Sequence, residues 1–298
     1  MSKYVGVDAG GSKTSVLLAD GEKVIARTTG APGAVRPGRA LQAASRIAAA
    51  VRRALTEANL LEADVLVVGA AGVGRDPERS ELREGLRGER LATRTLVTGD
   101  LDIALEAGFG SGPGIVLLSG TGSVAAARTA EGVVHRRGGY GWQMGDEGSG
   151  YAIGRAALIA AGRANDGRGA ATSLIDALLA QGPAREFAEL VRWSSAAEAG
   201  EVAALAPLVF SAAAAGDAIA RTIVESAAEE LAGMVSSLLP LFGGKGRVEV
   251  AIAGGNLEPK RGLRAPLLAR LRKTARLSIR EAPLDPAAGA LALARRQS

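Results

Sequence analysis

The chain has 298 residues, of which 47% are hydrophobic and 22% charged, so it is long enough for two domains and too apolar to be largely disordered. It has no cysteine and no apolar stretch of the ~20 residues that span a bilayer, and Asp8 interrupts the first apolar run; we therefore expect a cytoplasmic protein without disulfides, signal peptide or membrane partner. The net charge is +5, but basic residues are scattered and only 3% of residues are aromatic, so we expect no nucleic-acid partner.

The first part of the chain predicts three short strands and then alternating helices and strands. Asp20-Gly21 is typical of a hairpin turn, and Asp76-Pro77 is typical of a helix start. The expected elements are strands Tyr4–Val7, Thr14–Ala19 and Lys23–Thr29, helix Arg39–Ala58, strand Ala63–Gly69, a helix from Asp76, strand Arg94–Val97 and helix Leu101–Ala107.

The loop Gly108–Pro113 separates this part from a second series of elements. These are strand Gly114–Ser119, a hairpin of Val124–Arg128 and Gly132–Arg136, helix Tyr151–Ala161, an alanine-rich helical region up to Leu239, strand Val248–Ala253, helix Leu263–Arg272, strand Arg276–Arg280 and helix Pro286–Arg295. The order predicts an α/β fold with mixed sheets. Glycine turns at 8–13 and 119–123, each after a first strand, indicate two similar halves.

Glycine is the unusual residue in the composition. It accounts for 41 of 298 residues, about twice the usual ~7%, and it gathers at the ends of apolar runs. Glycine at a strand end lets the backbone approach a ligand closely. Several such clusters in one chain therefore indicate several loops that converge on one site.

The segment Asp8-Ala-Gly-Gly-Ser-Lys-Thr14 lies between two expected strands and has the composition of a phosphate-binding loop. Its glycines let backbone N–H groups face a phosphate, Lys13 adds a positive charge, and Ser12 or Thr14 adds a hydroxyl. Asp8 is suited to hold Mg²⁺ through water. A tight hairpin with a solvated acid explains the same residues equally well, because glycine turns are common.

The segment Ser119-Gly-Thr-Gly-Ser123 follows a buried strand and is suited to cradle a second phosphate. It also matches GxGxxA from Gly120 to Ala125, a pattern of dinucleotide-binding proteins that requires a helix after the loop. Val124–Arg128 predicts a strand instead, so we reject the dinucleotide interpretation. A Walker A motif is also absent, because Gly244-Lys245 is followed by Gly246.

Asp100 lies at the end of an expected strand, where ligand sites gather in α/β sheets. A carboxylate there is suited to accept a hydroxyl proton during phosphoryl transfer. The alternative is an N-cap of the next helix, the commoner role for an isolated Asp. Asp102 competes for either role.

Three further polar residues each have a functional and a structural interpretation. Asp146, in Gly145-Asp-Glu-Gly-Ser-Gly150, is suited to bind sugar hydroxyls or to act as an acidic cap, and Ser149 to start the following helix. His135 is the only histidine, so we expect a structural role rather than a metal cluster or serine-hydrolase chemistry.

Taken together, the segments DAGGSKT, GD, SGTGS, GYGWQMGDEGSG and AGGN, in this order, resemble the BadF/BadG-type ATPase group. Within that group the chain looks like the N-acetylglucosamine kinases of the sugar kinase/Hsp70/actin superfamily. The resemblance implies two ribonuclease H-like (actin-like ATPase) lobes with mixed sheets flanked by helices and a cleft between them. The N-terminal lobe would comprise residues 1–112 and 286–298, and the C-terminal lobe residues 113–285.

The resemblance also implies roles for particular residues. Asp8 would guide Mg²⁺, and Asp100 would be the catalytic base that also contacts the sugar. The residues matching the family's nucleotide-binding positions are Gly10, Gly11, Ser12, Lys13 and Thr14 in the first loop, Gly120, Thr121, Gly122 and Ser123 in the second, and Gly254, Gly255 and Asn256 beside the adenosine. Those matching sugar-contacting positions are Gly139, Tyr140 and Asp146.

The implied activity is ATP- and Mg²⁺-dependent phosphorylation of N-acetylglucosamine, glucosamine or a related hexose at the 6-hydroxyl, by a homodimer with a dimer face on residues 151–239. Two departures from the family favour a non-catalytic nucleotide or sugar sensor as the alternative. Tyr140 stands where the family has Trp, and the loop Gly30–Val35 lacks the family's sugar-binding Asn. A DNA-binding regulator would need an added helix-turn-helix, whereas this chain begins directly with the first strand. The absence of cysteine excludes the iron–sulfur subgroup.

Overall fold

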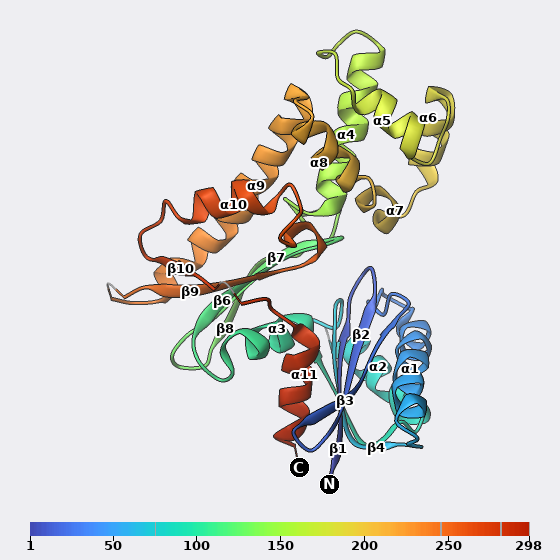
Figure 1. Ribbon diagram of the computed structural model, residues 1–298, viewed down its shortest axis with the longest axis vertical. Coiled ribbons are helices and arrows are strands. Elements are labelled where there is room, and N and C mark those ends of the chain that lie inside the picture. The colour runs from blue at the N-terminus through green and yellow to red at the C-terminus, as the bar shows by residue number, and fades with distance from the viewer. Residues whose placement is uncertain (75, 245, 281, 298) are drawn as a thin grey trace. The chain divides into compact units, whose positions relative to one another are not determined.

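The computed structural model describes residues 1–74, 76–244, 246–280 and 282–297 (Figure 1). Internal contacts divide the chain into two compact units. Unit 1 comprises Met1–Gly114 and Leu284–Ser298, and unit 2 comprises Ile115–Pro283. The last helix of the chain therefore belongs to the same unit as the first strand.

Unit 1 is built on a five-stranded sheet of order β3-β2-β1-β4-β5. Its strands are β1 (Lys3–Ala9), β2 (Thr14–Asp20), β3 (Lys23–Gly30), β4 (Ala63–Ala70) and β5 (Ala92–Gly99). β2 is antiparallel to β1 and β3, whereas β1, β4 and β5 are mutually parallel neighbours. Because β1, β4 and β5 run the same way, Asp8 and the residue after Gly99 lie at the same edge of the sheet.

Helices cover both faces of this sheet, as Figure 1 shows. They are α1 (Ala40–Glu57), α2 (Asp76–Gly88), α3 (Asp100–Phe109) and α11 (Pro286–Arg295). Alternate strand residues point to opposite faces. Thus Val5 and Val7 of β1 pack in the core under α1 and α2, whereas Tyr4 packs with Ile103 of α3 and Leu291 of α11.

Unit 2 is built on a second five-stranded sheet, of order β10-β9-β6-β7-β8. Its elements are strands β6 (Gly114–Ser119), β7 (Ser123–Arg128), β8 (Val134–Gly138), β9 (Val248–Ala253) and β10 (Leu277–Ile279), helices α4 (Gly150–Asn165), α5 (Leu174–Gln181), α6 (Phe187–Ala196), α7 (Ala199–Ala203), α8 (Ala206–Ala214), α9 (Ala218–Leu238) and α10 (Arg264–Leu271), and the short turns η1 (Leu239–Leu241) and η2 (Gly255–Leu257). β6, β9 and β10 are parallel neighbours, and β7 is antiparallel to β8.

The two sheets have the same strand order when each is counted from its first strand: third, second, first, fourth, fifth. This confirms the prediction of two similar halves. It also confirms the α/β fold class with two mixed sheets flanked by helices.

Most predicted elements are confirmed to within a few residues, and two details differ. The second hairpin strand, predicted at Gly132–Arg136, lies at Val134–Gly138, because Thr129 and Gly132 form the turn: the Gly132 amide donates to the Thr129 carbonyl oxygen at 3.0 Å. The alanine-rich region after α4 is a series of separate helices, α5 to α9.

Within the described residues, no single helix has the length and apolarity to cross a membrane. One sharply bent pair, Ala199–Ala214 with Ala218–Leu241, meets the length and composition test only as a pair.

Candidate functional site

The first glycine loop of unit 1 connects β1 to β2 and is fixed by backbone hydrogen bonds. The Gly10 amide donates to the Lys13 carbonyl at 3.0 Å, and the Gly10 carbonyl accepts from the amides of Gly33 and Ala34 at 3.2 and 3.1 Å. Thr14 is buried, and its hydroxyl donates to the Ala31 carbonyl at 2.6 Å. The Thr14 hydroxyl thus joins the loop to residues 31–34, while residues 11–13 are exposed.

Three carboxylates of unit 1 interact electrostatically beside this loop. Asp8 is the penultimate residue of β1, Asp100 follows β5, and Asp285 precedes α11. Burial is the main cause that raises the pKa of Asp8 from its ordinary 3.8 to about 7; the negative charges of Asp100 and Asp285 contribute to this rise, and Lys13 opposes it. A site that disfavours the Asp8 anion in this way is one that a bound cation would stabilise.

Asp100 is not the N-cap of α3. That position is held by Gly99, whose amide donates to the Asp102 carboxylate at 3.0 Å. The Thr98 hydroxyl also donates to Asp102. Asp102 therefore closes the helix end, whereas Asp100, partly buried, accepts from the Leu101 amide at 3.0 Å within the first turn. Asp100 and Asp102 therefore have different roles, although they lie only two residues apart.

The raised pKa of Asp8 predicts how the stability of the metal-free protein depends on pH. The unfolded chain loses this proton near pH 3.8 and the folded chain only near pH 7, so stability falls as pH rises between these values. Asp8→Asn removes this loss. In EDTA at pH 8 we expect its free energy of unfolding to exceed that of wild type by up to about 4 kcal/mol, with no difference below pH 4. Urea unfolding at pH 8 and below pH 4 measures the difference in free energy of unfolding. If this free energy had the same pH profile in Asp8→Asn and wild type, the prediction would be contradicted.

The second glycine loop, residues 119–123 of unit 2, is held by the segment that leads into α4. Ser119 is fully buried and its hydroxyl donates to the Gly148 carbonyl at 2.9 Å, and the Ser123 hydroxyl donates to the Glu147 carbonyl at 2.6 Å. β7 begins directly at Ser123, so a strand follows the loop and the rejection of a dinucleotide fingerprint is confirmed.

Asp146 faces this second loop. It has a left-handed backbone with φ of 61°, and its carboxylate accepts from the Ser123 amide at 3.4 Å. A Cβ on Gly122 would lie 3.0 Å from the same carboxylate. Burial raises the pKa of Asp146, and Glu147 adds to this, while the Ser123 amide and Arg136 oppose it. The Asp146 carboxylate therefore lies close enough to interact electrostatically with a charge bound at the loop.

Ser149 caps α4, as predicted: its hydroxyl oxygen accepts from the Ala152 amide at 3.1 Å.

The remaining expected sugar-contacting residues are at the surface of unit 2. Gly139 has a φ of 68°, and Tyr140, which follows it, is 67% exposed with the Arg136 guanidinium 5.8 Å from its ring centre. Trp142 is half exposed and packs against Tyr151 with ring centres 5.3 Å apart. The amide of Gly141, which lies between Tyr140 and Trp142 in the chain, donates to the Asp146 carboxylate. His135 lies in β8, opposite Ala127 of β7.

The third segment of unit 2, residues 253–256, follows β9. Gly254 has a φ of 107°, and η2 begins at the next residue. The Asn256 side chain is buried and its amide nitrogen donates to the Ser119 hydroxyl at 3.2 Å and to the Gly120 carbonyl at 2.8 Å. The expected adenosine segment and the second glycine loop are therefore in direct contact.

The structure gathers the predicted residues into two groups, one in each unit. Sequence reasoning missed Asp285 in unit 1. It placed Ser119 of unit 2 in the phosphate-binding segment, whereas the Ser119 hydroxyl donates to the Gly148 carbonyl. The Asp-Pro pair at 285–286, a helix-start signal like Asp76-Pro77, could have drawn attention to Asp285. Among the residues described, no three His, Cys, Asp or Glu side chains come together as a metal site.

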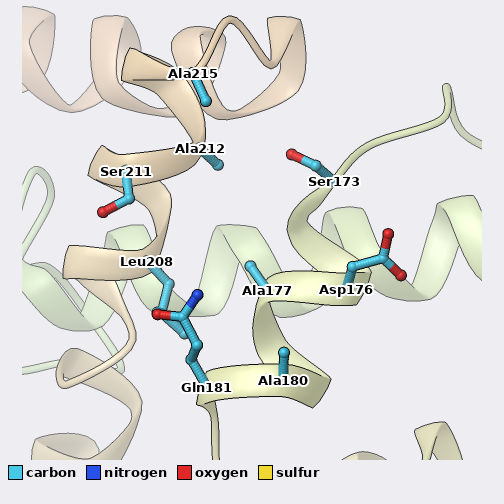
Figure 2. A pocket seen from close by; sticks show the side chains of 9 residues that line it. All are labelled: Ser173, Asp176, Ala177, Ala180, Gln181, Leu208, Ser211, Ala212 and Ala215. Carbon is cyan, nitrogen blue, oxygen red and sulfur yellow. The ribbon is translucent and has the colours of Figure 1, made fainter.

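Two hollows on the surface of the described part of the chain lie away from both groups. One of about 340 Å³, between α5 and α8 (Figure 2), is lined by Ser173, Asp176, Ala177, Ala180, Gln181, Leu208, Ser211, Ala212 and Ala215. Another, of about 400 Å³, is bordered by Glu62 and by residues of α2 and β5. Neither contains a predicted site residue.

Comparisons with family models, curated proteins and solved structures identify relatives of the same kind. The model of the BadF/BadG/BcrA/BcrD ATPase family matches residues 5–294. The chain is 30% identical over 261 residues to N-acetylmuramic acid/N-acetylglucosamine kinase of Clostridium acetobutylicum, covering 86% of this chain and 85% of the relative. It is 29% identical over 317 residues to N-acetyl-D-glucosamine kinase of Dictyostelium discoideum, covering 99% and 98%. A solved structure described as a candidate N-acetylglucosamine kinase from Chromobacterium violaceum is 27% identical, with a TM-score of 0.82 and coverage of 98% and 99%.

Proposed function

Because the chain belongs to the BadF/BadG/BcrA/BcrD ATPase family, we propose that it is an ATP-dependent sugar kinase. Its substrate is N-acetylglucosamine or a related amino sugar, and the product is the sugar 6-phosphate. The observation that carries the proposal is the similarity, over nearly the whole chain, to two kinases that act on N-acetylglucosamine.

The residues of unit 1 support the chemistry of this proposal. Phosphoryl transfer needs positioning and charge stabilisation more than covalent participation by the protein. Residues 11–13 are exposed, and their amides and the Lys13 ammonium would hold phosphate oxygens. The Asp100 carboxylate would orient the sugar hydroxyl and take its proton as the oxygen bonds to the γ-phosphorus and ADP leaves.

Mg²⁺ fits the acids present. Mg²⁺ keeps several waters and is commonly bound through one or two carboxylates together with substrate phosphates, so a full cage of protein ligands is not required. The donor would be Asp8, whose anion is destabilised by burial and by Asp100 and Asp285. When bound, the ion would neutralise charge on the triphosphate.

We propose nucleotide and sugar contacts for residues of unit 2 as well. We assign Thr121, Gly122 and Ser123 to phosphate, and Gly254 and Gly255 to adenosine. Gly139, Tyr140 and Asp146 are assigned to the sugar, since Tyr140 offers an exposed aromatic ring and the next residue, Gly141, donates its amide to the Asp146 carboxylate.

N-acetylmuramic acid is a second candidate substrate. The relative from Clostridium acetobutylicum is named for both sugars. The loop that carries a sugar-binding Asn in the family has Gly33 and Ala34 in this chain. The amides of both residues donate to the Gly10 carbonyl. Gly33 is packed against Thr14 and Ile47, so the support for N-acetylmuramic acid comes from the named relative.

A substrate panel tests the proposal. Purified protein with ATP and Mg²⁺ is offered N-acetylglucosamine, N-acetylmuramic acid, N-acetylmannosamine, glucosamine and glucose, and ADP release is followed. We expect ADP release that depends on N-acetylglucosamine or N-acetylmuramic acid and stops when EDTA is added. No sugar-dependent ADP release with any of them would instead support a non-catalytic sensor.

We also propose that the protein is cytoplasmic, where ATP is available, and forms a homodimer. Exposed apolar side chains on the helices of unit 2, Ile159 and Val191, support such a face. Light scattering should give a mass near twice 30.1 kDa, whereas a mass near 30.1 kDa would contradict the dimer.

A further inference from the structure

Asn256 has hydrogen bonds that its place in the adenosine segment did not predict. Its side chain is only 9% exposed, and its amide nitrogen donates twice, to the Ser119 hydroxyl at 3.2 Å and to the Gly120 carbonyl at 2.8 Å. Both acceptors belong to the second glycine loop. The side-chain nitrogen is thus used to bind this loop.

These bonds continue beyond the loop. Ser119 accepts from Asn256 and donates its own hydroxyl hydrogen to the Gly148 carbonyl at 2.9 Å. Three segments of unit 2 are thereby joined: the one after β9, the glycine loop after β6, and the segment that leads into α4. Because buried hydrogen-bonding groups are costly to leave unpaired, each bond holds its neighbours in place.

The Gly120 carbonyl is held from two sides. It accepts from Asn256 and also from the Gly150 amide at the start of α4, each at 2.8 Å. In a trans peptide the C=O and the following N–H point in opposite directions. Holding the Gly120 carbonyl toward Asn256 and α4 therefore directs the Thr121 N–H away from them.

The next peptide is held in the same way. The Thr121 carbonyl accepts from the Tyr151 amide at 3.2 Å, so the Gly122 N–H also points away from α4. Two successive N–H groups with a common outward direction form an anion-binding concavity. The Gly150 and Tyr151 amides at the start of α4 already donate to carbonyls of the loop, so the N–H groups available to an anion are those of the loop itself.

We propose that Asn256 is a positioning residue for nucleotide phosphate: it orients the Gly120–Thr121 peptide so that the Thr121 amide faces the phosphate. This rests on the proposed kinase function and adds to it a specific link between the adenosine segment and the phosphate loop. Asn256 acts through Gly120 and Ser119 and need not touch the nucleotide.

Steady-state kinetics of Asn256→Ala test the role. We expect the KM for ATP to rise about tenfold, the equivalent of one lost net hydrogen bond, with the KM for the sugar within twofold of wild type. Asn256→Asp keeps the shape but places an acceptor opposite the Gly120 carbonyl, so we expect at least the same rise. Asn256→Gln keeps the donor and should recover part of the loss.

Two controls separate positioning from general destabilisation. Asn165→Ala makes the same chemical change at an exposed position near the end of α4. Leu267→Ala opens a cavity in the core of unit 2, under α10, and lowers stability without touching the loop. Titration of a fluorescent ATP analogue, well below the Tm of every variant, gives the same comparison without turnover. Ser119→Ala removes the bonds of this hydroxyl to Asn256 and Gly148 but keeps the bond from Asn256 to the Gly120 carbonyl, so it should raise the dissociation constant only about threefold.

The outcomes are distinct for the two claims. Sugar-dependent turnover by wild type tests the proposed function, and the ratio of variant to wild type tests the role of Asn256. An unchanged KM for ATP in Asn256→Ala, or an equal rise in Leu267→Ala, would overturn the positioning role alone. No ATP binding by wild type would overturn both.

Discussion

Replacing Asp100 by Asn is expected to lower kcat for sugar phosphorylation by about 10²–10⁴-fold, the usual contribution of a general base. The amide is close in shape to the carboxylate but cannot accept the hydroxyl proton. It also removes a negative charge near Asp8. ATP binding should therefore stay within about threefold of wild type or tighten, as a nucleotide-binding titration would measure.

Asp102→Asn is the matched control, because Asp102 lies on the same first turn of α3. Its carboxylate accepts from the Gly99 amide at 3.0 Å and from the Thr98 hydroxyl, so its role is to close the helix. We expect a loss of about 1 kcal/mol in stability and a kcat within a few-fold of wild type. If Asp102→Asn lost turnover and Asp100→Asn retained it, the two roles would have to be exchanged.

Gly254→Ala is expected to destabilise unit 2 by about 3–5 kcal/mol and to abolish measurable nucleotide binding. The backbone at Gly254, with φ of 107° and ψ of 154°, lies in a region that essentially only glycine adopts. A Cβ there would lie 2.2 Å from the Ser119 carbonyl oxygen. Strain and overpacking therefore add, and relief would move the segment away from the second loop.

Gly255→Ala is the matched control for stability. A Cβ at Gly255 meets nothing within 4 Å, and we expect a change within about 0.5 kcal/mol. Chemical denaturation of both variants measures the difference. Equal stability of Gly254→Ala and wild type would show that the close approach of the two segments does not exist in solution.

The sheets could be predicted because their strands have a strong local pattern. Val5 and Val7 alternate with Tyr4 and Gly6, and turns with Asp or Gly follow, so each strand and its ends can be read from a short window. The similarity of the two halves could also be predicted, since the two glycine turns each follow a first strand. The separate helices α5 to α9 could not be distinguished, because alanine favours helix throughout and marks no boundary.

The site could be predicted only in part, because sequence gives residue types but not the partners of each group. Thr14 and Asn256 were both expected to face ligand, yet the Thr14 hydroxyl donates to Ala31 and the Asn256 amide to Ser119 and Gly120. These bonds join residues far apart in the chain, and no local pattern predicts them. Asp285 was missed for the same reason, since only the return of α11 to unit 1 brings it near Asp8.

The proposed transfer is tested most directly by finding where the phosphorus goes. The protein is incubated with ATP, Mg²⁺ and N-acetylglucosamine, and the products are examined by ³¹P–¹H correlation NMR and mass spectrometry. We predict equal amounts of ADP and a sugar phosphate whose phosphorus couples to the protons on carbon 6. Formation of inorganic phosphate in place of a sugar phosphate, with N-acetylglucosamine unchanged, would contradict the assignment as a sugar kinase.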